Sequence, residues 1–287
     1  MKRILVTGEN SYIGTSFVTY MEQFKEEYEI ETISVRGDEW REKDFSIYDA
    51  IYHVAGLAHQ KETKKNKLDY YNINTKLTKE IAIKAKCEGV NHFLYLSSMS
   101  VYGLIEGEIS RNTEISPTSH YGKSKRLAEI ELKLLEDINF SVAIIRPPMV
   151  YGKDCKGNYQ TLSNFSKKTI FFPKIENERS VIYIDNLNMV VKEIILNQSS
   201  GYFHPQNSDY MTTYQLVQIV SEISKRRVFF TNKMNFLVNF MKKKVVKIKK
   251  VFGSLKYSSE LVSFPELELI SFEDSIILTE SKEMKNE

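Results

Sequence analysis

The sequence predicts an α/β fold with a doubly wound parallel sheet and a smaller C-terminal lobe. Short apolar runs that are typical of buried strands alternate with stretches of helical apolar spacing as far as Pro148. The first apolar run leads directly into a glycine-containing turn and a helix. Beyond Pro148 the alternation fades into short, mixed segments. Together these observations favour a parallel sheet followed by a second substructure.

The first strand is predicted at Arg3–Thr7, with a turn at Gly8–Gly14 and a helix over Thr15–Tyr28. A dinucleotide-binding loop needs this order, because glycine lets the backbone approach a pyrophosphate and a helix N-terminus offers N–H groups. A plain strand-to-helix turn explains the same residues. The second strand, Ile30–Val35, ends at Arg36, which favours the 2′-phosphate of NADP. A solvated arginine in a turn explains Arg36 equally well.

The third and fourth strands end in residues that suit a ligand site. Asp49–Gly56 finishes in small side chains, which leave room for a cofactor against the backbone. His92–Ser98 leads into further hydroxyl groups at the strand end, where open α/β sheets bind ligands. The helix between them, Leu68–Glu88, contains Asn74, and on its pattern alone we expect Asn74 to be exposed.

The helix predicted over Tyr121–Leu135 begins with a tyrosine and a lysine four residues apart. At that spacing Tyr121 and Lys125 share one helix face. A nearby cation lowers the pKa of a phenol from its usual value near 10, so such a pair can transfer protons near neutral pH. On spacing alone, a solvated tyrosine–lysine pair is the better explanation.

The remaining elements are shorter. The strand Phe140–Arg146 is stopped by two prolines. A strand at Arg179–Ile184 and a helix at Asp185–Asn197 follow. The last eight residues, Glu280–Glu287, are polar and are expected to be frayed.

The amino-acid composition limits the classes of protein to which the chain can belong. The 287 residues are 42% apolar, enough for a globular core. Two cysteines, Cys87 and Cys155, make neither a disulfide framework nor a metal site, which favours a reducing compartment. Strand-like sequence from Arg3 leaves no room for a signal peptide, and no apolar run is long enough to span a membrane. We therefore expect a cytoplasmic protein.

One segment is strongly basic. Residues 225–256 hold eleven Lys and Arg and no Asp or Glu, whereas the other residues carry 29 basic and 37 acidic side chains. A basic amphipathic helix in this segment can rest on anionic lipid through residues 233–252, which would place the protein at the inner face of the cell membrane. A helix that packs its apolar side and leaves its lysines in water is the favoured alternative. Nucleic-acid binding is not expected, because no recognised module accompanies the charge.

Six motifs together resemble the extended short-chain dehydrogenase/reductases, also called NAD-dependent epimerase/dehydratases. In chain order they are Thr7-Gly-x-x-x-x-Ile-Gly14, His53-Val-Ala-Gly56, Ser97-Ser-Met-Ser-Val-Tyr-Gly103, Tyr121-x-x-x-Lys125, Arg146-Pro-Pro-x-x-Tyr-Gly152, and Arg179 ahead of Tyr183-Ile-Asp185. The resemblance covers almost the whole chain and implies a Rossmann fold that uses NADP(H) or NAD(H). It divides the chain into a dinucleotide-binding domain of residues 1–155, to which 179–198 return, and a substrate-binding lobe of residues 156–178 and 199–287.

The resemblance also implies a role for each matching residue. Ser98 would bind a carbonyl oxygen, Tyr121 would carry the proton, and Lys125 would lower the Tyr121 pKa and bind the nicotinamide ribose. The cofactor-binding residues would be Gly8, Asn10, Ser11, Tyr12, Ile13, Gly14, Arg36, Ala55, Gly56, Asn74, Tyr121, Lys125 and Pro148. The substrate-binding residues would be Ser98, Met99, Ser100, Asn158 and Arg179, with Arg179 on a nucleotide-sugar diphosphate.

The chain departs from the family pattern at three places. Ser11 replaces the middle glycine of the loop, and the segment Val35–Asp49 is short and lacks a strand-end acid. Sugar-nucleotide 4,6-dehydratases carry Asp-Glu after the catalytic hydroxyl, where this chain has Met99 and Ser100. Neither side chain can move a proton at neutral pH, so we expect no dehydration. Reduction or epimerisation of a sugar remains.

A narrower resemblance is to the 4-ketoreductases of capsule and O-antigen synthesis. It rests on Arg146–Gly152, Gly157-Asn158, Phe203–Gln206 and Phe252–Ser258. It implies reduction of a UDP-4-keto-6-deoxy-N-acetylhexosamine to UDP-N-acetylfucosamine or UDP-N-acetylquinovosamine. A UDP-sugar 4-epimerase of the UDP-glucose or UDP-N-acetylglucosamine type uses the same triad and is the nearest alternative. A catalytically idle nucleotide sensor is a more distant alternative, and a homodimer stays open.

Overall fold

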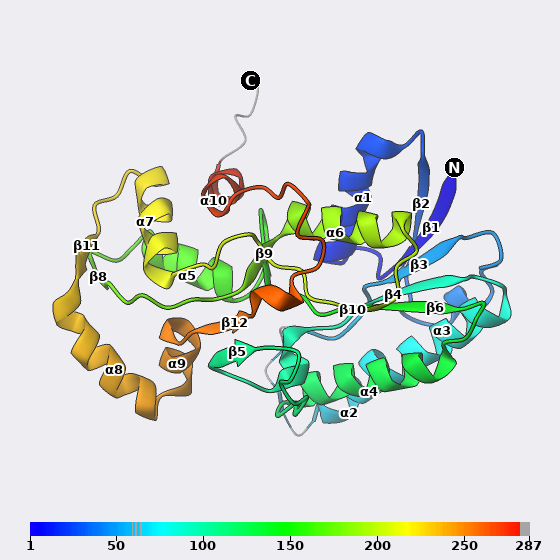
Figure 1. Ribbon diagram of the computed structural model, residues 1–287, viewed down its shortest axis with the longest axis horizontal. Coiled ribbons are helices and arrows are strands. Elements are labelled where there is room, and N and C mark those ends of the chain that lie inside the picture. Colours follow the sequence, from blue (N-terminus) through cyan, green and yellow to red (C-terminus); the bar gives the residue numbers. More distant parts are fainter. Residues whose placement is uncertain (59, 61, 64, 282–287) are drawn as a thin grey trace. The chain divides into compact units, whose positions relative to one another are not determined.

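A computed structural model describes residues 1–58, 60, 62–63 and 65–281, and it shows an α/β protein (Figure 1). Contacts divide the chain into two compact units. The first unit comprises Met1–Gly103, Glu114–Pro147 and Leu187–Pro205. The second comprises Leu104–Thr113, Pro148–Asn186 and the described residues from Gln206 onward. The assignment of cofactor and substrate to separate domains stays a prediction.

The first unit is built on a parallel sheet of six strands in the order β10-β6-β4-β3-β1-β2. The strands are β1 (Lys2–Thr7), β2 (Tyr28–Ile33), β3 (Ala50–His53), β4 (His92–Leu96), β6 (Ser141–Ile145) and β10 (Gly201–Phe203). The next strand, β2, pairs with β1 on one side, and the following strand, β3, pairs with β1 on the other side. The predicted doubly wound parallel sheet is therefore confirmed. The order in which the chain adds strands to the sheet reverses between β1 and β3. Ligands of such sheets bind at this switch point, outside the carboxyl ends of the strands.

Helices cover both faces of this sheet. Figure 1 shows α1 (Tyr12–Met21) and α6 (Ile184–Leu196) on one face, and α3 (Thr78–Cys87) and α4 (His120–Leu135) on the other. The core on the α3–α4 side joins strand residues to small residues of both helices. Its fully buried members include Leu5, Ile51, Phe93, Ala85 and Ala128. This packing holds the strand ends, and the loops that follow them, in fixed positions.

Two predicted element boundaries and one predicted placement are wrong. α1 ends at Met21 and a 3₁₀ turn follows, because Tyr28 is buried and opens β2. The helix predicted over Leu68–Glu88 is interrupted by a π-helical turn, Asn72–Leu77, between α2 (Lys67–Tyr71) and α3. β10 lies at the sheet edge beside β6, although its residues were expected in the lobe.

The short segment between β2 and β3 forms one 3₁₀ turn, Glu39–Arg41, in which Trp40 is buried. All residues of this segment are described, and none of them forms a strand. The sheet therefore ends at β2.

The described residues of the second unit form three two-stranded parallel pairs and five complete helices. The pairs join β7 (Met149–Tyr151) to β9 (Val181–Tyr183), β5 (Gly107–Ile109) to β12 (Leu255–Tyr257), and β8 (Phe171–Pro173) to β11 (Phe229–Thr231). The helices are α5 (Asn158–Ser166), α7 (Thr213–Ile223), α8 (Asn235–Lys244), α9 (Val246–Phe252) and α10 (Phe272–Glu280). No helix in the described part of the chain is long and apolar enough to cross a bilayer.

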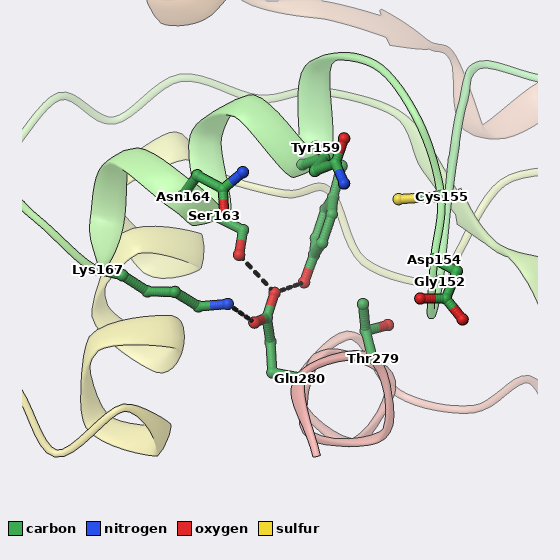
Figure 2. A pocket seen from close by; sticks show the side chains of 10 residues that line it. Gly152, Asp154, Cys155, Tyr159, Ser163, Asn164, Lys167, Thr279 and Glu280 are labelled. Atoms are coloured by element: carbon green, nitrogen blue, oxygen red, sulfur yellow. Dashed lines mark hydrogen bonds and ion pairs between the residues drawn. The ribbon is translucent and has the colours of Figure 1, made fainter. Parts of the chain in front are cut away.

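The last residue of the C-terminal helix α10, Glu280, bonds to side chains of α5. The fraying expected at Glu280 is therefore wrong. The Glu280 carboxylate accepts hydrogen bonds from the hydroxyls of Tyr159 (2.8 Å) and Ser163 (2.7 Å) and pairs with Lys167 at 2.7 Å (Figure 2). A pocket of about 140 Å³ lies beside these residues and is also lined by Cys155. Residues 282–287, the rest of that prediction, lie outside the described residues.

Candidate active site

The loop after β1 is packed too tightly for side chains at its glycines. Gly8 has φ +96°, and a Cβ there would lie 2.9 Å from the backbone nitrogen of Ala55. A Cβ on Gly14 would lie 2.7 Å from Ser11 Oγ and 3.1 Å from Val54 Cγ2. Ser11 caps α1, because its hydroxyl accepts from the Gly14 N–H at 3.1 Å. The serine that replaces the usual middle glycine thus has a structural role, and the loop keeps the close backbone packing that a pyrophosphate site requires.

The other predicted residues of this loop lie at the same strand end. Asn10 has φ +61°, a left-handed conformation that asparagine tolerates. Tyr12 and Ile13 begin α1, so the positive end of that helix faces the loop. Arg36 lies beyond the end of β2 and is exposed, in the position predicted for a contact to the adenosine side of the cofactor.

Lys125 is buried beneath the glycine that follows β3. Its side chain is on α4, and the residue is 4% exposed. Its ammonium donates to the Leu96 carbonyl oxygen at 2.7 Å and lies 4.7 Å from the centroid of the Tyr95 ring. A Cβ on Gly56 would lie 3.1 Å from Lys125 Nζ. Burial lowers the pKa of Lys125 to about 7, against the opposing effect of the Glu129 carboxylate.

The Ser98 hydroxyl lies near the Tyr121 hydroxyl and lowers the pKa of Tyr121, but burial raises this pKa by more, so the phenol keeps its proton at neutral pH. Ser98 follows β4 and caps the 3₁₀ turn Met99–Tyr102, and its hydroxyl accepts from the Ser100 N–H at 3.1 Å. The Lys125 ammonium donates to a carbonyl of β4. That Lys125 lowers the pKa of Tyr121 stays a prediction.

Asn74 is fully buried, so the expectation of an exposed residue is wrong. It lies in the π-helical turn, a feature that often marks functional sites. Its side-chain oxygen accepts from the Leu57 N–H at 2.7 Å, and its amide donates to the Leu57 carbonyl (3.2 Å) and to Ser124 Oγ (3.0 Å). Asn74 thus ties the loop after β3 to the helix of Tyr121 and Lys125. Its predicted contact to the cofactor stays a prediction.

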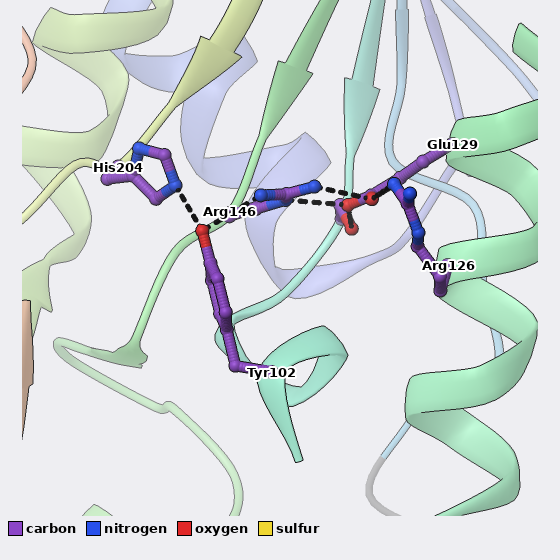
Figure 3. Close-up of polar contacts among 6 residues, drawn as sticks. Tyr102, Arg126, Glu129, Arg146 and His204 are labelled. Carbon is purple, nitrogen blue, oxygen red and sulfur yellow. Dashed lines mark hydrogen bonds and ion pairs between the residues drawn. The ribbon is translucent and has the colours of Figure 1, made fainter. Parts of the chain in front are cut away.

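A buried ionic network supports this strand end, and the sequence analysis missed its acid (Figure 3). Arg146 donates from Nε and Nη2 to the two oxygens of Glu129 at 2.9 and 2.7 Å. Arg146 Nη1 donates to the Tyr102 hydroxyl, which also bonds to His204 Nε2, each at 2.8 Å. The Ser97 hydroxyl donates to Glu129 at 2.6 Å. The only sequence signal was the spacing of Glu129, one helical turn after Lys125.

The other three predicted residues belong to the second unit and lie on separate elements. Pro148 is buried directly before β7, and Asn158 is the exposed first residue of α5. Arg179 donates from Nη1 to the Gly253 carbonyl at 2.8 Å, and among the described residues no carboxylate lies within 4 Å of its guanidinium. Burial lowers the pKa of Arg179, and Glu106 opposes this change. Such a guanidinium has donors available for an anion.

Comparison with known proteins identifies the family. The sequence model of the NAD dependent epimerase/dehydratase family matches residues 4–191. The chain belongs to this family. The family resemblance inferred from the six motifs is therefore confirmed.

Two curated relatives of this epimerase/dehydratase chain have names that describe enzymes acting on sugars. A UDP-glucose 4-epimerase of Vibrio cholerae is 31% identical over 212 residues, which are 65% of this chain and 64% of that protein. A UDP-2-acetamido-2,6-beta-L-arabino-hexul-4-ose reductase of Pseudomonas aeruginosa is 28% identical over 206 residues, which are 64% of this chain and 47% of that protein. The match thus spans about half to two thirds of the length of these relatives.

The solved structure of a UDP-glucuronic acid 4-epimerase from Bacillus cereus in complex with NAD is similar to this fold. The TM-score is 0.74 at 16% identity, with 97% of each chain covered. The predicted extended Rossmann architecture is confirmed by this likeness.

The buried lysine of this epimerase/dehydratase chain is expected to make its stability depend on pH. The pKa of Lys125 is about 7 when folded, against its ordinary 10.5, so between these values the unfolded chain binds the extra proton and the free energy of unfolding rises with pH. Relative to Lys125→Met, the wild type is expected to gain up to about 1.4 kcal/mol per pH unit above pH 7. Urea unfolding of both proteins at several pH values measures this difference. Lys123→Met, at an exposed position of the same helix, is the control and should show no such trend. A pH-independent difference for Lys125→Met would contradict the assignment.

Proposed function

We propose that this chain reduces the C4 ketone of a UDP-4-keto-6-deoxy-N-acetylhexosamine, giving UDP-N-acetylfucosamine or UDP-N-acetylquinovosamine for surface polysaccharide. The supporting observation is the Tyr121 phenol, which lies near the Ser98 hydroxyl at the carboxyl end of the sheet and has a raised pKa. A phenol that keeps its proton at neutral pH is suited to donate it. Ketone reduction needs such a donor, because the oxygen becomes an alkoxide as hydride reaches the carbon.

Each residue of the site has one task in this reaction. Bound NADPH or NADH supplies the hydride. The Ser98 hydroxyl donates a hydrogen bond to the ketone oxygen, and Tyr121 delivers its proton to that oxygen as the alcohol forms. Lys125 holds its amine beneath Gly56, only 3.1 Å from where a Cβ would lie, and would bind the nicotinamide ribose from there. The ketone thus gains one hydride and one proton.

The loops at the switch point fit a dinucleotide. The tight glycine turn at Gly8 and the N-terminus of α1 suit its pyrophosphate. The exposed Arg36 suits a 2′-phosphate, which favours NADPH over NADH. Arg179, with guanidinium donors available, suits the substrate diphosphate.

Dehydration does not fit this site. Met99 and Ser100 follow the catalytic hydroxyl, and neither is a general acid or base at neutral pH. The Ser100 hydroxyl accepts from Ser98 at 3.1 Å, which gives it a structural partner.

A UDP-sugar 4-epimerase is the second candidate, and the 31% identity to the Vibrio cholerae epimerase favours it. An epimerase would use Ser98, Tyr121 and Lys125 in both directions. Tyr121 would first accept the proton of the C4 hydroxyl, and a retained NAD⁺ would accept the hydride. A raised Tyr121 pKa makes this first step harder.

Incubation of the purified protein with the UDP-4-keto sugar and NADPH or NADH separates the candidates. The reductase is expected to consume reduced cofactor in proportion to ketone, and NMR of the product identifies the fuco or quinovo configuration. No consumption with either cofactor would refute reduction. Tightly bound NAD⁺ in the purified protein, with interconversion of UDP-glucose and UDP-galactose, would establish the epimerase instead.

A further inference from the structure

The basic segment of the second unit contains two short helices in place of the one amphipathic helix that its pattern suggests. α8 ends at Lys244, and α9 begins at Val246 after an extended Val245. One side of this segment packs inward. Val238 and Phe252 are each 8% exposed and lie in a cluster with Phe172 of β8.

The other side of α8 carries apolar side chains with no described partner surface. Phe236 is 84% exposed, Leu237 55% and Phe240 50%. At 3.6 residues per turn these three positions lie together on the side of α8 away from Val238. The sequence favoured a helix whose apolar side packs and whose lysines alone face water. This expectation therefore holds for the packed side of α8 but not for its outward side.

Most of the charge of the segment is also unneutralised within the described part of the chain. Lys242 and Lys249 pair with Glu106 at 3.3 and 3.1 Å, and Lys256 pairs with Glu178. The other basic residues of the segment have no carboxylate within 4 Å among the described residues. They are Lys225, Arg226, Arg227, Lys233, Lys243, Lys244, Lys247 and Lys250.

Cations and exposed aromatic rings are interleaved on the same helix side. Lys243 and Lys244 stand one turn beyond Phe240, and the ammonium of Lys244 lies 4.7 Å from the Phe240 ring centroid. Lys233 precedes Phe236 by one turn. We name the surface of Lys233, Phe236, Leu237, Phe240, Lys243 and Lys244 the α8 face.

We propose that the α8 face docks on an anionic lipid bilayer. An interfacial helix inserts apolar side chains at the boundary of headgroups and acyl chains while its lysines contact anionic headgroups, and the α8 face presents both. A second copy of the chain would bring two sets of unneutralised cations together, which disfavours self-association. Nucleic acid would neutralise the lysines but would leave Phe236 and Leu237 without an apolar environment.

Vesicle sedimentation tests the proposal. The protein is expected to sediment with vesicles of phosphatidylcholine and phosphatidylglycerol at low salt and to remain in the supernatant with phosphatidylcholine alone. Lys243→Glu/Lys244→Glu should weaken binding by more than an order of magnitude, because each basic residue near an anionic surface contributes a factor on the order of five. Phe236→Ser/Phe240→Ser should weaken it similarly.

Matched variants on the first unit control for charge and apolarity. Leu134→Ser/Ile138→Ser removes side chains of residues that are 76% and 96% exposed, and Lys25→Glu/Lys65→Glu makes the same charge change as the α8 variant. Both should bind vesicles as the wild type does. Protein that stays in the supernatant with anionic vesicles at low salt would overturn the proposal.

Fluorescence tests insertion directly. Trp40 is the only tryptophan and is 1% exposed, so a Phe236→Trp variant adds one exposed reporter. Its emission is expected to shift to shorter wavelength with anionic vesicles. If Phe236→Ser/Phe240→Ser instead lowers the molecular mass measured in solution, the α8 face joins two copies of the chain and the proposal is wrong. None of these measurements depends on catalytic activity.

Discussion

A Tyr121→Phe variant is expected to lose turnover by about 10²–10⁴-fold while it still binds the nicotinamide cofactor. The substitution removes the hydroxyl that lies near Ser98 but keeps the ring, which packs edge-on against Tyr70 at 6.4 Å between centroids. The loss should therefore fall on proton transfer, with little change in the fold. Steady-state rates with the 4-keto sugar, together with a cofactor titration, measure the two effects separately.

Tyr71→Phe is the matched control for this variant. Tyr71 also presents a phenol near the start of α4, where it bonds to His120 Nδ1 at 3.1 Å, but it has no contact to Ser98. Its loss should leave turnover within a few-fold of the wild type. If Tyr121→Phe kept comparable turnover, Tyr121 would not be the proton donor and the proposed reaction would need another acid.

The features predicted well from the sequence are those set by neighbouring residues. The strand, glycine turn and helix at Gly8–Gly14 depend on local backbone freedom and on a cap that Ser11 itself supplies. The spacing of Tyr121 and Lys125 places both on one helix face wherever that helix packs. These parts of the candidate site could be predicted because their causes lie within a few residues.

The features that the sequence analysis missed depend on distant partners. Glu129 looks like an exposed helix residue until Arg146 of the neighbouring strand end neutralises it. Asn74 looks exposed until Leu57 and Ser124 bind its amide. The outward apolar side of α8 belonged to the less favoured of two alternatives for a related reason, since periodicity does not say which of two apolar sides will pack. Such outcomes are decided by tertiary packing.

The network of Glu129 and Arg146 is expected to dominate the stability of the first unit. Glu129 has no exposed surface, and the Arg146 side chain is 4% exposed. Both carboxylate oxygens and three guanidinium nitrogens are bonded within the protein. Because the Ser97 hydroxyl also donates to Glu129, the network holds the residue directly before Ser98. Breaking the network should therefore affect both folding and the catalytic hydroxyl.

Arg146→Met is expected to lower the free energy of unfolding by about 3–5 kcal/mol, since it leaves the Glu129 carboxylate buried without its main counter-ion. Arg126→Met removes only the partly exposed second partner of Glu129, 3.0 Å away, and should cost no more than about 1 kcal/mol. Urea unfolding of both variants measures this contrast.

Glu129→Leu/Arg146→Met removes both charges and should recover much of the loss, because a buried pair can often be replaced by apolar residues at little cost. Equal losses in Arg126→Met and Arg146→Met would show that the buried pair is not what stabilises this strand end. A lower turnover of Arg146→Met, with cofactor affinity unchanged, would show that the network also positions Ser98 for the ketone.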